Sequence, residues 1–257
     1  MRIAAVSYLN ARPLIYGLDR DSHIQLSLDV PSKLIDQLRN STADVAHLPT
    51  IDYQRLPNLK LIPAGGIGSD GPTLTVRIFA HEPIEKIRAL ACDPDSHTSI
   101  ALARIILAER FNVFPELVDL SNATDRRDQA MLLIGDKVVC EEPPNCRHQY
   151  DLGEQWKQLT GLPFVFAIWT ARADVDLGDL PKRLEKAKQD GLNHVEELIE
   201  QYAKPRGWPT KLARQYLTNY LKFDIGEPQI RAIEKFHQLA AKHHLIDRPH
   251  PLQIHKM

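Results

Sequence analysis

The chain has 257 residues, a length that suits one large domain or a pair of lobes. Hydrophobic residues make up 43% and charged residues 25%, and the formal net charge of −1 excludes a broad field that would attract nucleic acid or an anionic membrane. No apolar run reaches the roughly 18 residues of a transmembrane helix, no signal-peptide pattern opens the chain and the cysteines number 3, so we expect a cytoplasmic protein without disulfides.

The first half of the chain alternates short apolar runs with helical patterns. The apolar runs predict strands at 3–6, 24–30, 44–48, 59–63 and 73–80. Helical patterns lie between them at 13–18 and 31–39. Because strand and helix alternate, we expect a sheet that is mostly parallel.

A second unit begins near Pro83. Its pattern predicts strands at 89–92, 117–120, 131–134 and 138–140, and helices at 99–111 and 153–159. An apolar aromatic strand at 163–169 leads back towards the first unit, and amphipathic helices follow at 180–202, 210–221 and 228–243. We therefore expect a two-lobed α/β clamp with a ligand cleft between a first lobe, 1–82 with 171–257, and an inserted second lobe, 83–170.

The opening stretch, MRIAAVSYLNARPL, carries the first candidate site. Ser7, Tyr8 and Asn10 follow directly after the strand predicted at 3–6. Ligands of open α/β sheets lie beyond the carboxyl ends of strands. Three hydrogen-bonding side chains at this point indicate a small-molecule site. The alternative is that Ser7 and Asn10 only cap the following helix.

A second candidate site is the segment DPDSHTS at 93–99, which joins a strand to a helix. Free N–H groups and the dipole at a helix start bind carboxylate or phosphate, and Ser96, Thr98 and Ser99 add hydroxyls. Helix capping is the simpler interpretation of the same residues and is compatible with anion binding.

Two further segments give weaker signals. The glycines of GGIGSDGP at 65–72 permit positive φ, which serves a ligand contact or a tight structural loop equally well. Thr75 lies just inside the next strand, where its hydroxyl can reach the cleft. Cys140, Cys146 and His148 lack metal-ligand spacing, so we expect no metal site.

Several motifs together resemble a known family. They are SYLNARPL at 7–14, PSKLIDQL at 31–38, DVAHLP at 44–49, SDGP at 69–72, DSHTS at 95–99, LLIGD at 132–136 and YDLGEQWKQLTGLPFVFAIW at 150–169. In this order, over about 1–172, they resemble the chorismate dehydratases of the futalosine route to menaquinone. That family is similar in fold to type II periplasmic solute-binding proteins, which agrees with the expected clamp.

The resemblance implies a lyase without cofactor or metal, which removes water from chorismate to give 3-[(1-carboxyvinyl)oxy]benzoate. It implies Asn10 and Thr75 as the catalytic residues, although the family often has serine at the position of Thr75. His97 also departs from the family, which often has arginine there. The substrate contacts that we expect are Ser7, Tyr8, Ser69, Gly71, Ser96, Thr98, Ser99 and Asp136.

Three other functions compete with this interpretation. A solute-binding protein for a small carboxylate fits the same fold, because fold does not fix function. The sister enzyme that releases 1,4-dihydroxy-6-naphthoate fits the same pathway. A ligand domain of a transcription factor is disfavoured, because no basic DNA-binding segment precedes residue 1.

Overall fold

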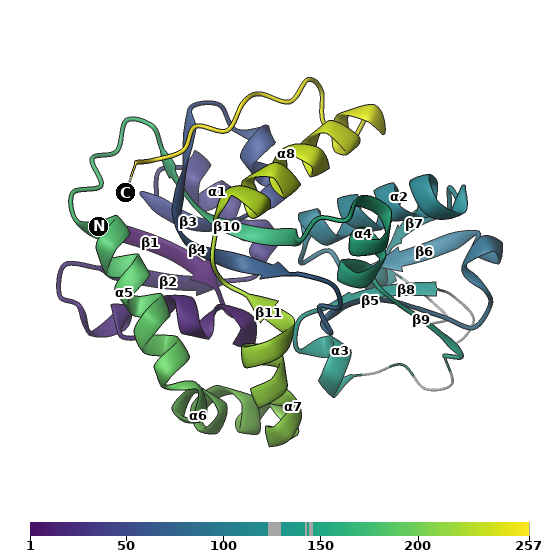
Figure 1. Ribbon diagram of the computed structural model, residues 1–257, viewed down its shortest axis with the longest axis horizontal. Coiled ribbons are helices and arrows are strands. Elements are labelled where there is room, and N and C mark those ends of the chain that lie inside the picture. The colour runs from purple at the N-terminus through teal and green to yellow at the C-terminus, as the bar shows by residue number, and fades with distance from the viewer. Residues whose placement is uncertain (123–129, 142, 144–145, 257) are drawn as a thin grey trace.

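Two β-sheets, each flanked by helices, form the two lobes of the molecule (Figure 1). The computed structural model describes residues 1–122, 130–141, 143 and 146–256. The strand order is β11-β4-β10-β3-β1-β2 in the first sheet and β7-β6-β8-β5-β9 in the second. β1 pairs in parallel with β2 and β3, and β6 pairs in parallel with β7 and β8. The expected two-lobed α/β architecture is confirmed.

The elements have the following bounds. The first sheet contains β1 (Arg2–Val6), β2 (Gln25–Asp29), β3 (Val45–Pro49), β4 (Leu59–Ser69), β10 (Phe164–Arg172) and β11 (Leu221–Lys222). The second sheet contains β5 (Val76–Ala80), β6 (Ala89–Cys92), β7 (Glu116–Asp119), β8 (Ala130–Ile134) and β9 (His148–Asp151). The α-helices are α1 (Leu34–Arg39), α2 (His97–Phe111), α3 (Lys137–Cys140), α4 (Leu152–Thr160), α5 (Leu180–Asn193), α6 (Val195–Leu198), α7 (Thr210–Gln215) and α8 (Glu227–Lys242).

The chain crosses between the lobes one strand away from each expected boundary. β5 precedes residue 83 but belongs to the second sheet, and β10 belongs to the first sheet although most of it precedes residue 171. The break near Pro83 is thus a turn inside the second lobe, which a composition shift does not distinguish from a lobe boundary. β10 is buried along nearly its whole length because it lies between β3 and β4.

Two expected elements are wrong in type. The segment 138–140, expected as a strand, lies in helix α3, because Gly135 takes a left-handed φ of 62° and turns the chain out of β8. The segment 13–18, expected as one helix, holds parts of two 3-10 helices, Leu9–Ile15 and Leu18–Arg20. Pro13 lies inside the first of them and lacks the N–H that an α-helix would use.

The glycine-rich segment is a strand for most of its length. β4 continues to Ser69, and a Cβ atom at Gly66 or Gly68 would lie 2.7 Å from a backbone oxygen of β10. Pairing of β4 with β10 is interrupted by register shifts in this region. These two glycines therefore let two central strands approach each other.

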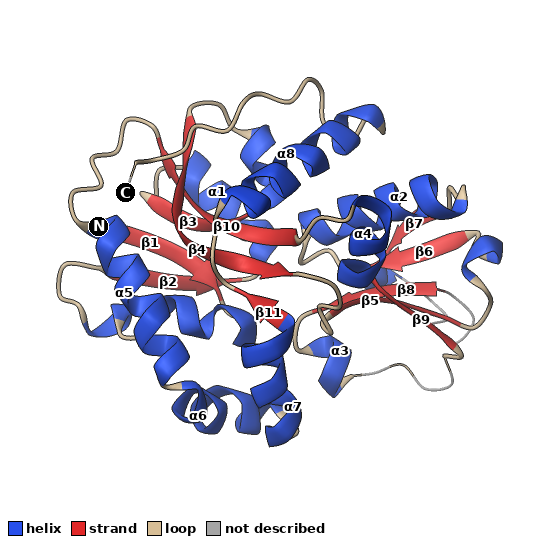
Figure 2. Ribbon diagram, in the orientation of Figure 1, coloured by secondary structure: helices blue, strands red, loops and turns tan. Residues whose placement is uncertain are grey.

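The lobes share a common apolar core. The indole of Trp156 on α4 packs edge-on against Phe164 of β10 and Phe236 of α8, with ring centroids 5.1 and 6.1 Å apart. Such edge-to-face pairs add to the burial of aromatic area. Figure 2 shows α5 and α8 on opposite sides of the first sheet, so helices shield this core from solvent on both faces.

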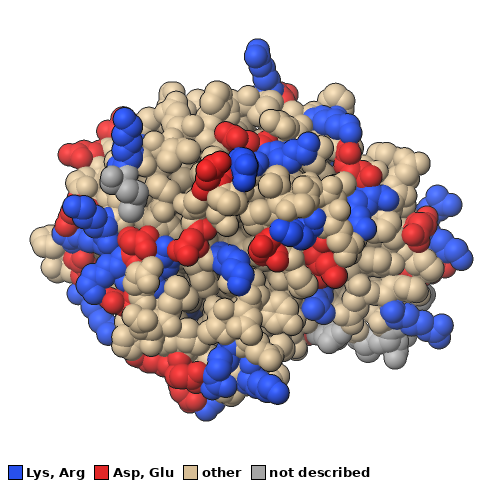
Figure 3. All heavy atoms as spheres, viewed as in Figure 1, with Lys and Arg blue, Asp and Glu red and all other residues tan. Residues whose placement is uncertain are grey.

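The surface carries charges of both signs. On the face shown in Figure 3, basic and acidic side chains are interspersed. None of the helices within the described ranges is long and apolar enough to cross a membrane.

Candidate functional site

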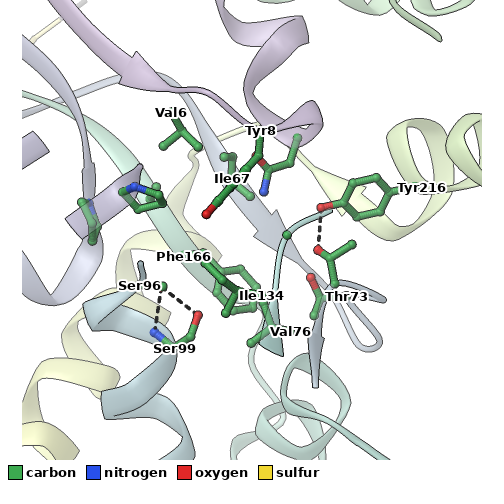
Figure 4. Close-up of a pocket in the computed structure, with 16 residues that line it drawn as sticks. Val6, Tyr8, Ile67, Thr73, Val76, Ser96, Ser99, Ile134, Phe166 and Tyr216 are labelled. Atoms are coloured by element: carbon green, nitrogen blue, oxygen red, sulfur yellow. Dashed lines mark hydrogen bonds between the residues drawn. The ribbon is translucent and has the colours of Figure 1, made fainter. Parts of the chain in front are cut away.

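A pocket lies where the two sheets meet (Figure 4). The space between its lining residues, part of which is open to solvent, measures about 460 Å³. Val6 at the end of β1 and Pro49 at the end of β3 line it from the first lobe, and Ile134 at the end of β8 lines it from the second. The described lining residues include no acidic side chain, lysine, arginine or histidine. Ligands of open α/β sheets bind at such carboxyl ends.

Asn10 lines the pocket from the 3-10 helix Leu9–Ile15, directly after β1. Its amide oxygen Oδ1 is buried and accepts no hydrogen bond from the residues that the structure describes. The backbone before it is fixed, because the Arg12 guanidinium donates to the Ser7 carbonyl at 2.8 Å. An unpaired buried acceptor is costly, which makes Oδ1 available to a ligand.

Thr75 lines the same pocket from the position directly before β5, in the second lobe. It was expected just inside a strand over 73–80, but β5 begins only at Val76. Its Oγ1 lies 2.6 Å from the hydroxyl of Tyr216. The residue before it, Leu74, has a left-handed φ of 70°, which costs about 1–2 kcal/mol for a residue with a Cβ atom. The segment that presents Thr75 is therefore held in a strained conformation.

The carboxylate of Asp151 holds that segment in place. It accepts hydrogen bonds from the backbone N–H groups of Thr73 at 2.9 Å and Leu74 at 2.7 Å. The same carboxylate caps α4 by accepting from Gly153 at 3.0 Å. A Cβ atom at position 153 would lie 2.5 Å from the carbonyl oxygen of Gly71. The YDLG and SDGP motifs thus form one support for Thr75.

Tyr8 closes the pocket by joining the lobes. Its hydroxyl donates to Asp95 at 2.8 Å, and Asp95 also pairs with the Lys137 ammonium at 2.7 Å. The ring packs on Gly135, where a Cβ atom would lie 3.0 Å from it. Burial, aided by the Asp95 carboxylate, raises the pKa of Tyr8 well above its usual value.

The start of α2 presents two of its three predicted hydroxyls to the pocket. Ser96 is the N-cap residue, and its Oγ accepts from the Ser99 N–H at 3.2 Å; both serines line the pocket. Thr98 points elsewhere, because its Oγ1 accepts from the Ile51 N–H at 3.2 Å. His97 contacts the Asp52 carboxylate at 2.8 Å. Capping and a pocket contact therefore coexist at this helix start.

Four other predicted contacts lie outside the pocket lining. Ser69 is buried, with its Oγ beside Gly153, and Gly71 forms the turn that follows it. Ser7 uses its carbonyl to bind arginine side chains. Asp136 accepts from the Trp208 indole N–H at 3.2 Å, and burial raises its pKa. The contacts that these four residues make here are with neighbouring segments of the chain, and their contact with a substrate stays a prediction.

The sequence interpretation missed several lining residues, of which Tyr216, Thr73, Gly135 and Phe166 are examples. Tyr216 begins the π-helix Tyr216–Tyr220, a type of turn that recurs at functional sites. In the sequence it occupies an apolar position of an amphipathic helix, which gave no signal. Gly135 and Phe166 lie within motifs that carried the resemblance, so those motifs were the available signal.

Among the described residues, no three His, Cys, Asp or Glu side chains come together as metal ligands would. The Cys140 thiol donates to the Arg206 carbonyl at 2.9 Å, and the Cys146 sulfur lies 3.7 Å from a His81 ring nitrogen.

Known proteins match this chain in sequence. A family model described as menaquinone biosynthesis matches residues 1–242. A chorismate dehydratase from Thermus thermophilus is 26% identical over 252 residues, which cover 89% of this chain and 91% of that protein. A chorismate dehydratase from Campylobacter jejuni is 26% identical over 246 residues, which cover 92% of this chain and 96% of that protein.

Solved structures match it in fold. Protein AF1704 from Archaeoglobus fulgidus has a TM-score of 0.74 at 17% identity, covering 95% of this chain and 98% of that one. The alkanesulfonate-binding protein SsuA from Xanthomonas axonopodis pv. citri has a TM-score of 0.69 at 13% identity, covering 96% and 94%. The fold is therefore the two-lobed periplasmic-binding-protein-like fold. Because the family model spans nearly the whole chain, the protein belongs to the menaquinone biosynthesis family.

Proposed function

We propose that the protein is a chorismate dehydratase, a carbon–oxygen lyase that eliminates water from chorismate to give 3-[(1-carboxyvinyl)oxy]benzoate. The observation that carries this proposal is the meeting of Asn10 and Thr75, which come from different lobes, in one pocket. They are the two side chains to which the family resemblance gives a catalytic role. The two chorismate dehydratases to which the chain is similar support the same activity.

The pocket suits the parts of this substrate. Apolar walls from Val6, Ile134 and Phe166 match a six-membered ring. The start of α2, with Ser96 and Ser99, offers hydroxyls and a helix dipole to a carboxylate without a buried cation.

The side chains that line the pocket favour a mechanism in which the substrate supplies its own base. In the reaction a base removes a proton from the ring, the C–H electrons complete the aromatic system as the C–O bond breaks, and the leaving hydroxyl combines with the removed proton to form water. Tyr8 and Tyr216 are the titratable groups among the described lining residues, and burial raises the pKa of both, so they stay protonated. We therefore assign the base to the enolpyruvyl carboxylate of chorismate, with Asn10 and Thr75 hydrogen-bonding the departing hydroxyl.

The test is incubation of the purified protein with chorismate, followed by ultraviolet absorption and mass spectrometry. We expect an aromatic product that has lost one water. Binding without turnover would contradict the proposal and favour a solute-binding protein, the second candidate, which shares this fold with SsuA. An analogue without the enolpyruvyl carboxylate should bind but not be dehydrated; dehydration at the normal rate would overturn the assignment of the base.

A further inference from the structure

Tyr216 reaches the pocket from the C-terminal part of the chain, in which no motif carried the family resemblance. Its side chain is buried and lines the pocket, where Figure 4 labels it. The dashed line at Tyr216 in Figure 4 marks the 2.6 Å contact with Thr75 Oγ1. Asn10 lines the same pocket. The Tyr216 hydroxyl therefore contacts one side chain of the proposed catalytic pair directly and shares the pocket with the other.

The position of this phenol is fixed across the lobe boundary. The Tyr216 ring stacks on the indole of Trp208, with centroids 5.1 Å apart and planes 21° apart. The same indole donates its N–H to Asp136 of the second lobe at 3.2 Å. The Tyr216 phenol is thus held by the indole of Trp208, and this indole is hydrogen-bonded to Asp136 in the second lobe, which also carries Thr75.

The number of available hydrogens indicates which hydroxyl donates in the hydrogen bond between Tyr216 and Thr75. Only one hydrogen can lie between the oxygens of Tyr216 and Thr75. A phenol is the more acidic hydroxyl, so Tyr216 is the preferred donor and the Thr75 oxygen the preferred acceptor. The hydrogen of Thr75 is then free to point into the pocket. Burial raises the pKa of Tyr216, which keeps its proton in place at neutral pH.

We propose that Tyr216 is a positioning residue for the dehydration: it donates to Thr75 Oγ1 and so directs the Thr75 hydrogen towards the leaving hydroxyl of the substrate. This inference rests on the proposed function. It adds a residue from the helical tail to a site otherwise built from residues before position 172.

The test begins with the wild-type protein, whose turnover of chorismate decides the proposed function separately. Tyr216→Phe then removes the hydroxyl and keeps the ring that stacks on Trp208. We expect kcat to fall about 10- to 100-fold while KM changes less than about threefold, because an orienting bond is lost rather than a binding contact. Tyr53→Phe is the matched control. It removes a buried tyrosine hydroxyl that donates to the Leu59 carbonyl and accepts from the Gln253 N–H, and Tyr53 does not belong to the pocket lining, so kcat should not change.

A double-mutant cycle with Thr75→Val separates positioning from a general structural effect. If Tyr216 acts through Thr75, adding Tyr216→Phe to Thr75→Val should change kcat by less than about twofold. Additive losses, or an unchanged kcat in Tyr216→Phe, would overturn the inference while active wild-type enzyme leaves the proposed function standing.

A second variant covers a failure of Tyr216→Phe to fold. Trp208→Phe keeps a ring beneath Tyr216 but removes the N–H that binds Asp136. It should lower kcat with an intact Thr75 and have no further effect in the Thr75→Val background. An equal loss in both backgrounds would contradict positioning through Thr75.

Discussion

At the scale of single residues, the amide oxygen of Asn10 is a buried acceptor without a partner among the described residues, beside a pocket. A protein gains no stability from such a group, because desolvation of the oxygen is not offset by a hydrogen bond. Side chains kept at a cost to stability are typical of functional sites. Asn10 therefore has the physical signature of a ligand-binding residue.

Asn10→Ala should separate activity from stability. We expect kcat/KM for chorismate to fall about 100- to 1,000-fold, the range for loss of one group that stabilises a transition state. The melting temperature should stay the same or rise, because a buried unpaired oxygen is removed. Turnover and thermal denaturation measure the two effects. Asn219→Ala, on the exposed side of the π-helix, is the control; wild-type turnover in Asn10→Ala would exclude a role for Asn10.

The buried side chain of His47 should make the free energy of unfolding depend on pH. It is fully buried on β3 with its ring 4.9 Å from that of Trp169, and burial lowers its pKa to about 3. Below pH 6.5 the unfolded chain protonates this histidine while the folded protein does not, so stability falls as pH drops from about 6.5 towards 3. Each such histidine contributes a slope of about 1.4 kcal/mol per pH unit.

The check is urea unfolding of wild type and His47→Leu at pH 7, 6 and 5. The variant should lose less stability between pH 6 and 5. Some slope should persist, because burial also lowers the pKa of His237, to about 4. Identical slopes in the two proteins would contradict this assignment.

At the scale of elements, sequence patterns predicted which segments carry the site better than which side chains enter it. The start of α2 was expected to offer three hydroxyls, but successive helical residues are rotated by about 100°, so Ser99 faces the pocket while Thr98 faces the N–H of Ile51. The glycines before Ser69 were expected in a turn, yet Gly66 and Gly68 serve the contact between β4 and β10. Both outcomes depend on neighbours distant in sequence, which a local pattern does not specify.

Asp151 couples α4 to the segment that presents Thr75, so its carboxylate should matter to both stability and rate. Asp151→Asn keeps the size of the side chain but loses the charge that four backbone N–H groups share. We expect a loss of about 2 kcal/mol in the free energy of unfolding, from the cap and the charged hydrogen bonds, together with a lower kcat. Urea denaturation measures the loss of unfolding free energy, and chorismate turnover measures kcat.

Asp179→Asn, at the exposed start of α5, is the control and should cost less than about 0.5 kcal/mol. Equal effects of the two variants would refute the coupling between α4 and the segment that presents Thr75.

At the scale of the whole molecule, the site exists because two lobes are held together around it. The clamp itself was predictable from alternating strands and helices and from the motifs. Tyr216 was not, because its position in an amphipathic pattern only says that it is buried, and its contact with Thr75 spans 141 positions of the chain. The bond from Tyr8 to Asp95 spans 87 positions and was equally hidden. Both contacts link the lobes, so we expect the activity to depend on lobe closure.

The hydrogen bond from the Tyr8 hydroxyl to Asp95 should stabilise the closed arrangement of the two lobes. Tyr8→Phe keeps the ring on Gly135 but removes the 2.8 Å bond to Asp95, leaving other contacts such as the 2.9 Å bond from the Ser32 N–H to the Asp95 carbonyl. Losing a hydrogen bond to a carboxylate costs about 1.5 kcal/mol, which shifts the population towards open lobes and raises KM about tenfold. Small-angle scattering of the free protein should show a larger radius of gyration.

Tyr16→Phe is the matched control, because it loses a bond of equal length to Glu197 within the first lobe and should change neither quantity. If Tyr8→Phe matches the control in both measurements, closure does not depend on this bond, and the remaining contacts between the lobes, among them those of Asp136 with Trp208 and Arg206, are enough to hold the lobes together.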